Sequence, residues 1–552
     1  MRNFAGGRNR KKGASLFIAV AALIWVVLPM LGLFIDLGLL YATKARLQAA
    51  VDAAALGAAR ALNLGQNTSA QALSAQQNAV SWFYANFPNG NWMTFNTQMT
   101  ASNVTIVDSP NSANLRQVTV TASTSVPTLF MKILGFKSTA LSVSGQASRK
   151  DMVAMLVLDR SGSMCSINGA TAVQPCYKST AGSPCSAMIT AAKIFTGAFA
   201  EGRDQIGLLT FSDGFYLESK PTTSFQTLLG YSNSSGSANG LIDSISCNGG
   251  TGTAEAISLA YNELYKIAEP GAMNIVMLET DGLPNTLVYN FYASTPAPGA
   301  LNTTSNCQDA SNLTYKNGGW KTVASARQWI TGIPMNANGT GYMADVPAGS
   351  IGGFYTSDPA QGSYMDVLFN PRQTSDSSSN NSVTLPNANG CTFDGTTTNT
   401  YSDFNWLPSH DVYGNQVAPS NSYLPITLTS GYNDLTGSAS TDWPHTHAAA
   451  LNATDNAAYN VRTNATLPAY VFAIGLGGND GNPPDPILLQ RMANDSSGDQ
   501  FNNPAAYPTC SSEPSCVTYP SQPQGQFIYA PSAAQLGQAF LAISSQILRL
   551  SH

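Results

Sequence analysis

The most extended apolar run of the chain lies near its N-terminus. Residues 14–35 carry no charge, and Leu37–Leu40 continue the run after a single acid, Asp36. A membrane-spanning helix needs about 20 apolar residues, whereas the apolar core of a cleaved signal peptide has about 7 to 15. The pattern therefore predicts an uncleaved transmembrane helix over residues 14–40, with Asp36 reaching the lipid headgroups.

An amphipathic pattern follows this run. Apolar side chains recur at helical spacing of three or four residues, at Leu47, Val51, Ala54, Ala58 and Leu62. This spacing predicts that the helix continues, half-exposed, to about residue 63. A second helix is expected over residues 69–87. Three alternating segments, 103–107, 117–123 and 140–146, are typical of strands, with a short apolar helix at 128–134. We therefore expect a small α+β unit over residues 41–149.

The second part of the chain has a different pattern. Four segments are apolar without alternation, as in strands that are buried on both faces of a parallel sheet: residues 152–158, 205–211, 274–279 and 470–474. Helical patterns accompany them at residues 187–199, 253–267 and 532–548. This order predicts an α/β domain with a doubly wound, mostly parallel sheet over residues 150–552.

Two insertions interrupt this second domain, at residues 164–184 and 284–444. Both leave from the carboxyl edge of the predicted sheet. A structureless loop of the second insertion's length is unusual inside a compact domain. We expect an ordered subdomain there, held in part by Cys307 and Cys391.

Composition and charge narrow the class of protein. At 552 residues the chain is too long for one ordinary domain, and its 10% of charged residues, against about 25% on average, excludes a coiled coil. Five basic residues and no acid lie in residues 1–13, which leaves 21 basic against 31 acidic residues in the rest. No basic face remains for nucleic acid. The basic segment predicts a cytoplasmic N-terminus, a single membrane span and export of everything after residue 40.

The cysteines agree with export. There are eight, and none lies in the first 164 residues. An even number in an exported chain allows four disulfides, which eight cysteines can pair in 105 ways. Only Cys510 and Cys516 are close enough in sequence to suggest a pair.

Three segments of the N-terminal region resemble a known family. They are Lys-Lys-Gly-Ala-Ser at 11–15, Leu-Gly-Leu-Phe-Ile-Asp-Leu-Gly at 31–38 and Leu-Gln-Ala-Ala-Val-Asp-Ala-Ala-Ala-Leu-Gly-Ala-Ala at 47–59. Together they are similar to the N-terminal segment of TadE/TadG-like proteins of bacterial tight-adherence (Tad) pilus systems. The resemblance covers about 50 residues and implies a role in pilus assembly, with pilus components as partners.

Oxygen-bearing side chains follow two of the predicted strands and precede one helix. Asp159, Ser161 and Ser163 come directly after the strand 152–158, Thr251 lies in a Gly-rich loop before the helix 253–267, and Asp281 follows the strand 274–279. Hard divalent cations prefer such oxygens. Each motif alone is also typical of an ordinary turn. In this order, D-x-S-x-S, GGT and TDG resemble the metal-ion-dependent adhesion site of a von Willebrand factor A domain.

That resemblance implies a role for each residue. Ser161, Ser163 and Thr251 would supply oxygens to Mg²⁺ or Ca²⁺, while Asp159 and Asp281 would hold the ion mainly through water. One position would stay open for an acidic group of a protein partner. The sequence thus favours a non-enzymatic membrane protein that binds a partner through a cation. A surface adhesin released from the membrane and a metal-dependent hydrolase are the alternatives.

Overall fold

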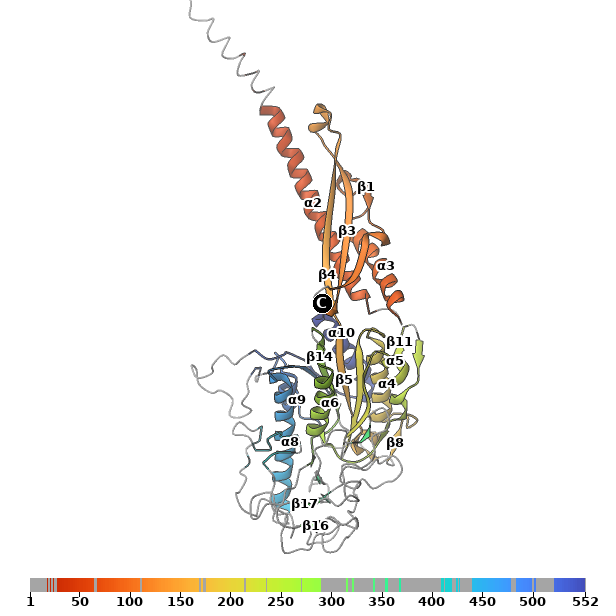
Figure 1. Cartoon of the computed structure of the whole chain (residues 1–552), viewed down its shortest axis with the longest axis vertical. Helices are drawn as coiled ribbons and strands as arrows, with labels where there is room; N and C mark the ends of the chain where they lie inside the picture. The colour runs from red at the N-terminus through yellow and green to blue at the C-terminus, as the bar shows by residue number, and fades with distance from the viewer. Residues whose placement is uncertain are drawn as a thin grey trace, which may run out of the picture. The chain divides into compact units, whose positions relative to one another are not determined.

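The computed structural model describes residues 27–63, 67–109, 112–288, 409–426, 439–477, 483–498 and 521–551, with short gaps inside some ranges and a few isolated residues elsewhere. It divides into two compact units, Met1–Lys150 and Asp151–Ser551 (Figure 1). The first contains two helices and a four-stranded sheet, and the second contains a seven-stranded sheet.

Two helices cover the sheet of the first unit. They are α2 (Leu28–Ala61) and α3 (Thr68–Asn86). The predicted apolar stripe of α2 is confirmed, since Leu47, Val51, Ala54, Ala58 and Leu62 are fully buried. Small alanines on this stripe let the helix approach the sheet closely, where Val118 and Val120 are buried in the same core. The amphipathic pattern of α2 is therefore satisfied inside the first unit.

The sheet of this unit is built around one long strand. β3 (Ser112–Pro127) pairs antiparallel with β1 (Phe95–Gln98), β2 (Val104–Ser109) and β4 (Ser138–Lys150). All thirteen residues of β4 pair with β3, from Ser138 opposite Pro127 to Lys150 opposite Leu115. The sequence predicted three of these strands: β2 at nearly its observed length, and β3 and β4 much shorter than observed. β1 was not predicted.

The tip of the β3–β4 hairpin contacts α2 through Asp36. The tip contains a short 3-10 helix, η4 (Met131–Leu134). The Asp36 carboxylate accepts hydrogen bonds from the backbone N–H groups of Leu129, Phe130 and Met131, at 2.7, 3.0 and 2.7 Å. Asp36 is only 1% exposed. Its partners thus come from a hairpin more than 90 residues along the chain, and the expectation that it reaches the headgroups stays a prediction.

Much of the predicted transmembrane segment, residues 14–40, lies outside the described residues. Its last part forms the beginning of α2, whose side chains at Met30, Leu31, Leu33, Phe34 and Ile35 are exposed. In the part of the chain that the structure describes, no helix is both long and apolar enough to cross a membrane.

The second unit contains a mixed seven-stranded sheet in the order β18-β10-β9-β5-β14-β21-β22. The strands are β5 (Met152–Asp159), β9 (Gln205–Phe211), β10 (Phe215–Thr222), β14 (Met273–Thr280), β18 (Gly341–Tyr342), β21 (Tyr470–Leu476) and β22 (Phe527–Ala530). Five neighbouring strands of this sheet, β9, β5, β14, β21 and β22, run parallel to one another. β10 runs antiparallel to β9. The predicted apolar strands form the centre of this sheet, whereas β10 was not predicted.

Helices cover both faces of this sheet (Figure 1). One face packs against α6 (Thr253–Ile267), α8 (Ala439–Thr463) and α9 (Pro486–Ala493). The other packs against α4 (Pro184–Gly197), α5 (Phe225–Leu229) and α10 (Ala533–Leu550). Alternate residues of β5 belong to the two cores, with Val157 in the first and Leu158 in the second. Burial on both sides explains why the strand sequences are continuously apolar.

Most of the larger predicted insertion, 284–444, lies outside the described residues, as do Cys307, Cys391, Cys510 and Cys516. The described part near its end contributes Val417 and Tyr423 to the first core, so this part belongs to the domain itself. The smaller insertion contains η5 (Gly162–Cys165) and the two-residue strands β6 (Ser166–Ile167), β7 (Ala170–Thr171) and β8 (Cys176–Tyr177).

Candidate metal centre

The five predicted metal-site residues lie at the carboxyl edge of two neighbouring parallel strands. Asp159 is the last residue of β5, and Ser161 and Ser163 follow it. Asp281 follows β14, which pairs with β5. Thr251 lies in the loop before α6. Ligands of open α/β sheets bind at this edge.

The hydroxyl groups of this edge converge on Asp281. Its Oδ1 accepts from Ser163 Oγ at 2.6 Å and from Ser161 Oγ at 3.3 Å, and the two serine oxygens are 2.9 Å apart. A Cβ placed on Gly282 would lie 3.5 Å from Thr251 Oγ1 and 3.7 Å from Ser163 Oγ. Both hydroxyls therefore lie beside Gly282.

Asp159 is fully buried and holds the loops in place. Its Oδ1 accepts from the backbone N–H of Ser161 at 2.7 Å, and its Oδ2 accepts from Thr280 Oγ1 at 2.6 Å. One carboxylate thus joins the end of β5 to the end of β14. It also fixes the turn that presents Ser161 and Ser163.

Backbone hydrogen bonds connect this turn to the Gly-rich loop. Gly162 N–H donates to Gly249 O at 2.7 Å, and Asn248 N–H donates to Arg160 O at 2.6 Å. Asn285 supports Thr251 from the other side: its Oδ1 accepts from Thr251 N–H at 2.7 Å, and its own N–H donates to Thr251 O at 2.9 Å. The three loops are therefore positioned by one hydrogen-bond network.

The edge is electrostatically suited to a cation. Burial raises the pKa of Asp159 to about 6. Burial, followed by the charges of Asp159 and Asp281, raises the pKa of Glu279 on β14 well above its usual range. Asp159 and Glu279 thus lie in a region where burial makes their ionisation unfavourable, and Asp281 adds a further charge beside Glu279. A dication would remove much of that cost.

The spacing of the oxygens also fits such an ion. Mg²⁺ holds six oxygens at about 2.1 Å, which places neighbouring oxygens of the octahedron about 3.0 Å apart. Ser161 Oγ and Ser163 Oγ are 2.9 Å apart, as two neighbouring positions of such an octahedron would be. Asp281 Oδ1, now hydrogen-bonded to both hydroxyls, would hold the ion mainly through water.

Two disulfides brace the loops of this centre. Cys165 pairs with Cys176, and Cys185 pairs with Cys247. Cys165 lies two residues after Ser163, and Cys247 directly precedes Asn248. In addition, β8 pairs with β13 (Ser246–Cys247), with Cys176 opposite Cys247. The bonds therefore connect the segments next to both metal-site loops.

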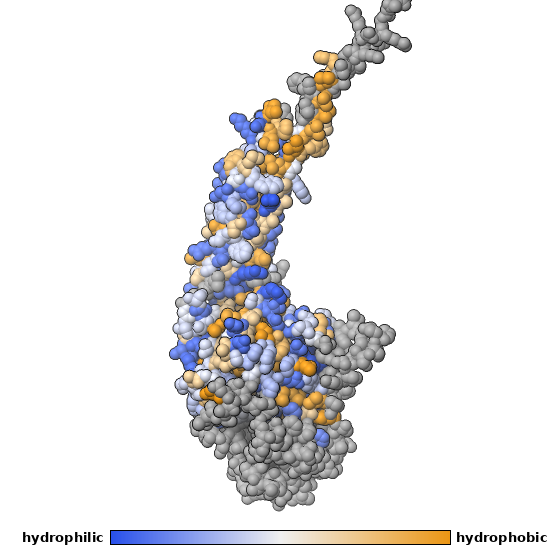
Figure 2. Space-filling model, turned by 180° about the vertical axis from the view of Figure 1, so that it is seen from behind, coloured by the Kyte–Doolittle hydropathy of each residue, from blue (hydrophilic) through white to orange (hydrophobic). Residues whose placement is uncertain are grey.

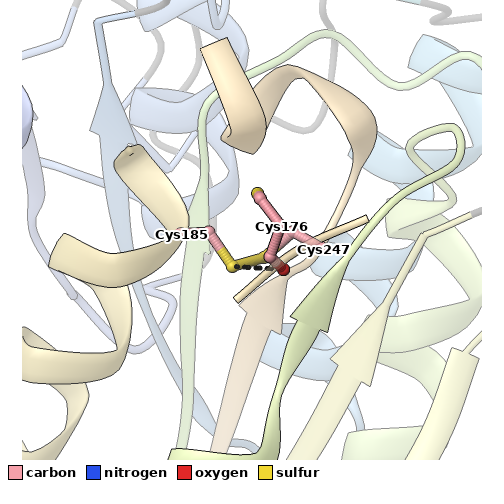
Figure 3. Close-up of side chains that lie close together, drawn as sticks. All are labelled: Cys176, Cys185 and Cys247. Atoms are coloured by element: carbon pink, nitrogen blue, oxygen red, sulfur yellow. Dashed lines mark hydrogen bonds between the residues drawn. A yellow bond between two sulfur atoms is a disulfide. The ribbon is translucent and has the colours of Figure 1, made fainter. Parts of the chain in front are cut away.

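The sulfur atoms of Cys176, Cys185 and Cys247 lie within 4.8 Å of one another, as Figure 3 shows. Three such cysteines would suit a soft metal as free thiolates. Here each belongs to a disulfide, and a disulfide sulfur is no thiolate ligand. The cluster is therefore a covalent brace, and oxygen ligands remain the ones that suit a hard cation.

Family comparisons match both parts of the chain. Residues 13–61 match the family described as putative Flp pilus-assembly TadE/G-like, and residues 154–283 match the von Willebrand factor type A domain. The chain joins a TadE/G-like segment to a von Willebrand factor type A domain. The A-domain match contains all five predicted metal-site residues. Both resemblances seen in the sequence are thus confirmed.

Several solved structures are similar to this chain at low identity. The PilB minor pilin from Streptococcus sanguinis is 10% identical, over 84% of this chain and 80% of the pilin, with a TM-score of 0.31. The vWF domain of the type V pili tip protein Mfa5 from Porphyromonas gingivalis is 14% identical, over 74% of this chain and 98% of that domain, with a TM-score of 0.31. The pilus adhesin SpaC from Lactobacillus rhamnosus GG is 11% identical, over 81% of this chain and 36% of the adhesin, with a TM-score of 0.31. No curated protein matches. These low TM-scores add nothing to the assignment.

Sequence reasoning missed two residues of the A-domain edge. Asn285 lies four residues after Asp281 and holds the Thr251 loop. Its only sequence signal is its place just after the Thr-Asp-Gly motif. Glu279 interrupts an otherwise apolar strand, which is a visible signal, because a fully buried acid is rare unless it is paired.

Proposed function

We propose that this chain is a non-enzymatic, single-pass inner-membrane protein of a Tad pilus system. Its A domain would lie outside the cytoplasm and bind a protein partner through a divalent cation. One observation carries the proposal: the hydroxyl oxygens of Ser161 and Ser163 and the carboxylate of Asp281 are hydrogen-bonded together at the carboxyl edge of the sheet, and the Thr251 hydroxyl lies beside the adjoining Gly282.

The side chains have distinct tasks in this proposal. Ser161, Ser163 and Thr251 supply neutral oxygens, while Asp159 and Asp281 provide the negative charge that balances a dication. A bound Mg²⁺ or Ca²⁺ would supply a positive centre with one position open to an acidic side chain of the partner. Specificity for that partner then comes from the surface around the edge.

Export and anchoring are parts of the same proposal. The basic segment before residue 13 favours a cytoplasmic N-terminus. Disulfides persist in oxidising compartments, and two are formed within the A domain. The TadE/G-like match at residues 13–61 supports a place in pilus assembly or anchoring.

Affinity capture from bacterial membranes tests the proposal. The full chain, tagged at its C-terminus, should retain a pilus component when Mg²⁺ or Ca²⁺ is present and release it when a chelator is added. Fractionation should place the chain in the inner membrane. A partner that is retained equally with the chelator would contradict the role of the cation, and a chain found only in the medium would favour a released adhesin.

A further inference from the structure

Apolar side chains remain exposed on the first unit, on the hairpin tip and at the beginning of α2. On the hairpin tip, Ile133 is 79% exposed and Phe136 is 60% exposed. The beginning of α2 adds exposed apolar side chains at Met30, Leu31, Leu33, Phe34, Ile35 and Leu37. Figure 2 shows this apolar character along the helix. We call these residues the tip surface. A contiguous group of exposed apolar side chains is typical of an interaction site.

The structure fixes the hairpin tip beside the predicted membrane segment. Asp36 accepts three backbone N–H groups of the tip. The Phe130 ring packs on Gly32 so closely that a Cβ added there would lie 2.5 Å from the ring. A helix rises about 1.5 Å per residue, so a hydrocarbon core of about 30 Å that begins at residue 14 ends near residue 34. On the predicted span, the tip would then lie at the level where the helix leaves the bilayer.

Charge indicates which partner covers this surface. The stretch from Ser109 to Lys150 contains no acidic residue. Lys132 and Lys137 flank the exposed side chains of the tip and are themselves exposed, while the acid at Asp36 is buried against backbone N–H groups. Such a surface suits the interface of a lipid bilayer, where the apolar side chains can contact acyl chains and the lysines can contact anionic headgroups.

We infer that the β3–β4 hairpin tip inserts into the outer leaflet of the same membrane and binds anionic phospholipid. Ile133 and Phe136 enter the acyl region, and Lys132 and Lys137 contact headgroup phosphates. Asp36 is a positioning residue that holds the tip at this depth. The inference rests on the proposed membrane anchoring. It gives the first unit a second attachment that a lone helix lacks.

Photo-crosslinking of the full chain in native membranes tests this inference. A diazirine amino acid is placed at Ile133, with Leu23 in the apolar run as the positive control. Gln146, exposed on β4 away from the tip, is the matched negative control. Lipid adducts are expected at Ile133 and Leu23 but not at Gln146. Adding Asp36→Ala should reduce the adduct at Ile133 and leave that at Leu23 unchanged.

The outcomes separate the two proposals. A lipid adduct at Leu23 together with a protein adduct, or none, at Ile133 would overturn the hairpin insertion while anchoring stands. Loss of lipid adducts at both sites would overturn both. In vesicles that contain phosphatidylglycerol, the double variant Lys132→Gln/Lys137→Gln should lower the Ile133 adduct several-fold, because the attraction of both lysines to the anionic surface is lost. An equal yield in vesicles with and without anionic lipid would contradict the headgroup contact.

Discussion

Replacing Asp159 with asparagine is expected to abolish the stabilisation that Mg²⁺ or Ca²⁺ gives to the A domain. A cation at about a hundred times its dissociation constant stabilises a folded protein by about 2.7 kcal/mol. The asparagine would keep the shape of the side chain and an acceptor for Ser161 N–H, but it removes one of the two charges that we assign to the cation. The hydroxyls that remain compete poorly with hydration, because Mg²⁺ releases water reluctantly. Thermal unfolding with and without metal measures the effect.

The variant should still fold. Burial raises the pKa of Asp159 to about 6, so at pH 7 the metal-free domain ionises this group at a cost that asparagine avoids. The metal-free midpoint is therefore expected at or above that of the wild type. Asp204→Asn is the matched control: Asp204 is equally buried and accepts backbone N–H groups of Met152 and Ala200 near the opposite end of the sheet. Asp204→Asn should keep the metal response. A metal response that persists in Asp159→Asn would place the cation elsewhere.

Removing the Cys185–Cys247 disulfide is expected to cost more stability than removing Cys165–Cys176. The two cysteines are 62 residues apart in Cys185–Cys247 and 11 residues apart in Cys165–Cys176. The chain-entropy model gives a stabilisation of about 4 kcal/mol for the longer loop and about 3 kcal/mol for the shorter one. The test compares the thermal midpoints of two double variants, Cys185→Ala/Cys247→Ala and Cys165→Ala/Cys176→Ala.

Both double variants should also weaken the metal response, because each bond ends next to a metal-site loop. Equal midpoints for the two variants, or no loss in either, would contradict the bracing role. A stability loss without any change in the metal response would limit that role to the fold.

The central strands and several helices could be predicted from the sequence, because their burial leaves a direct pattern. The strand at 152–158 is apolar throughout since both faces are covered, and the helix over 253–267 has the observed bounds. The strand β10 was missed, because its alternation of Phe215 and Leu217 with more exposed residues resembles that of many edge segments.

The sequence could place those candidate-site residues that come directly after a predicted strand. Adjacent parallel strands bring Asp159 and Asp281 to one edge, and the motif order adds Thr251. The disulfides were not predictable, because about 105 pairings fit the sequence equally and only the fold brings Cys185 to Cys247. The contacts of Asp36 were not predictable for a related reason: its partners are backbone N–H groups, which leave no mark in the sequence.

The position of a bound cation tests the central claim most directly. Mn²⁺ can replace Mg²⁺ at oxygen sites and scatters X-rays anomalously, so crystals of the chain grown with Mn²⁺ would locate the ion. The account predicts one anomalous peak at the carboxyl edge, within coordination distance of Ser161, Ser163 and Thr251. A peak at another place, or no peak at this edge at a saturating Mn²⁺ concentration, would contradict it.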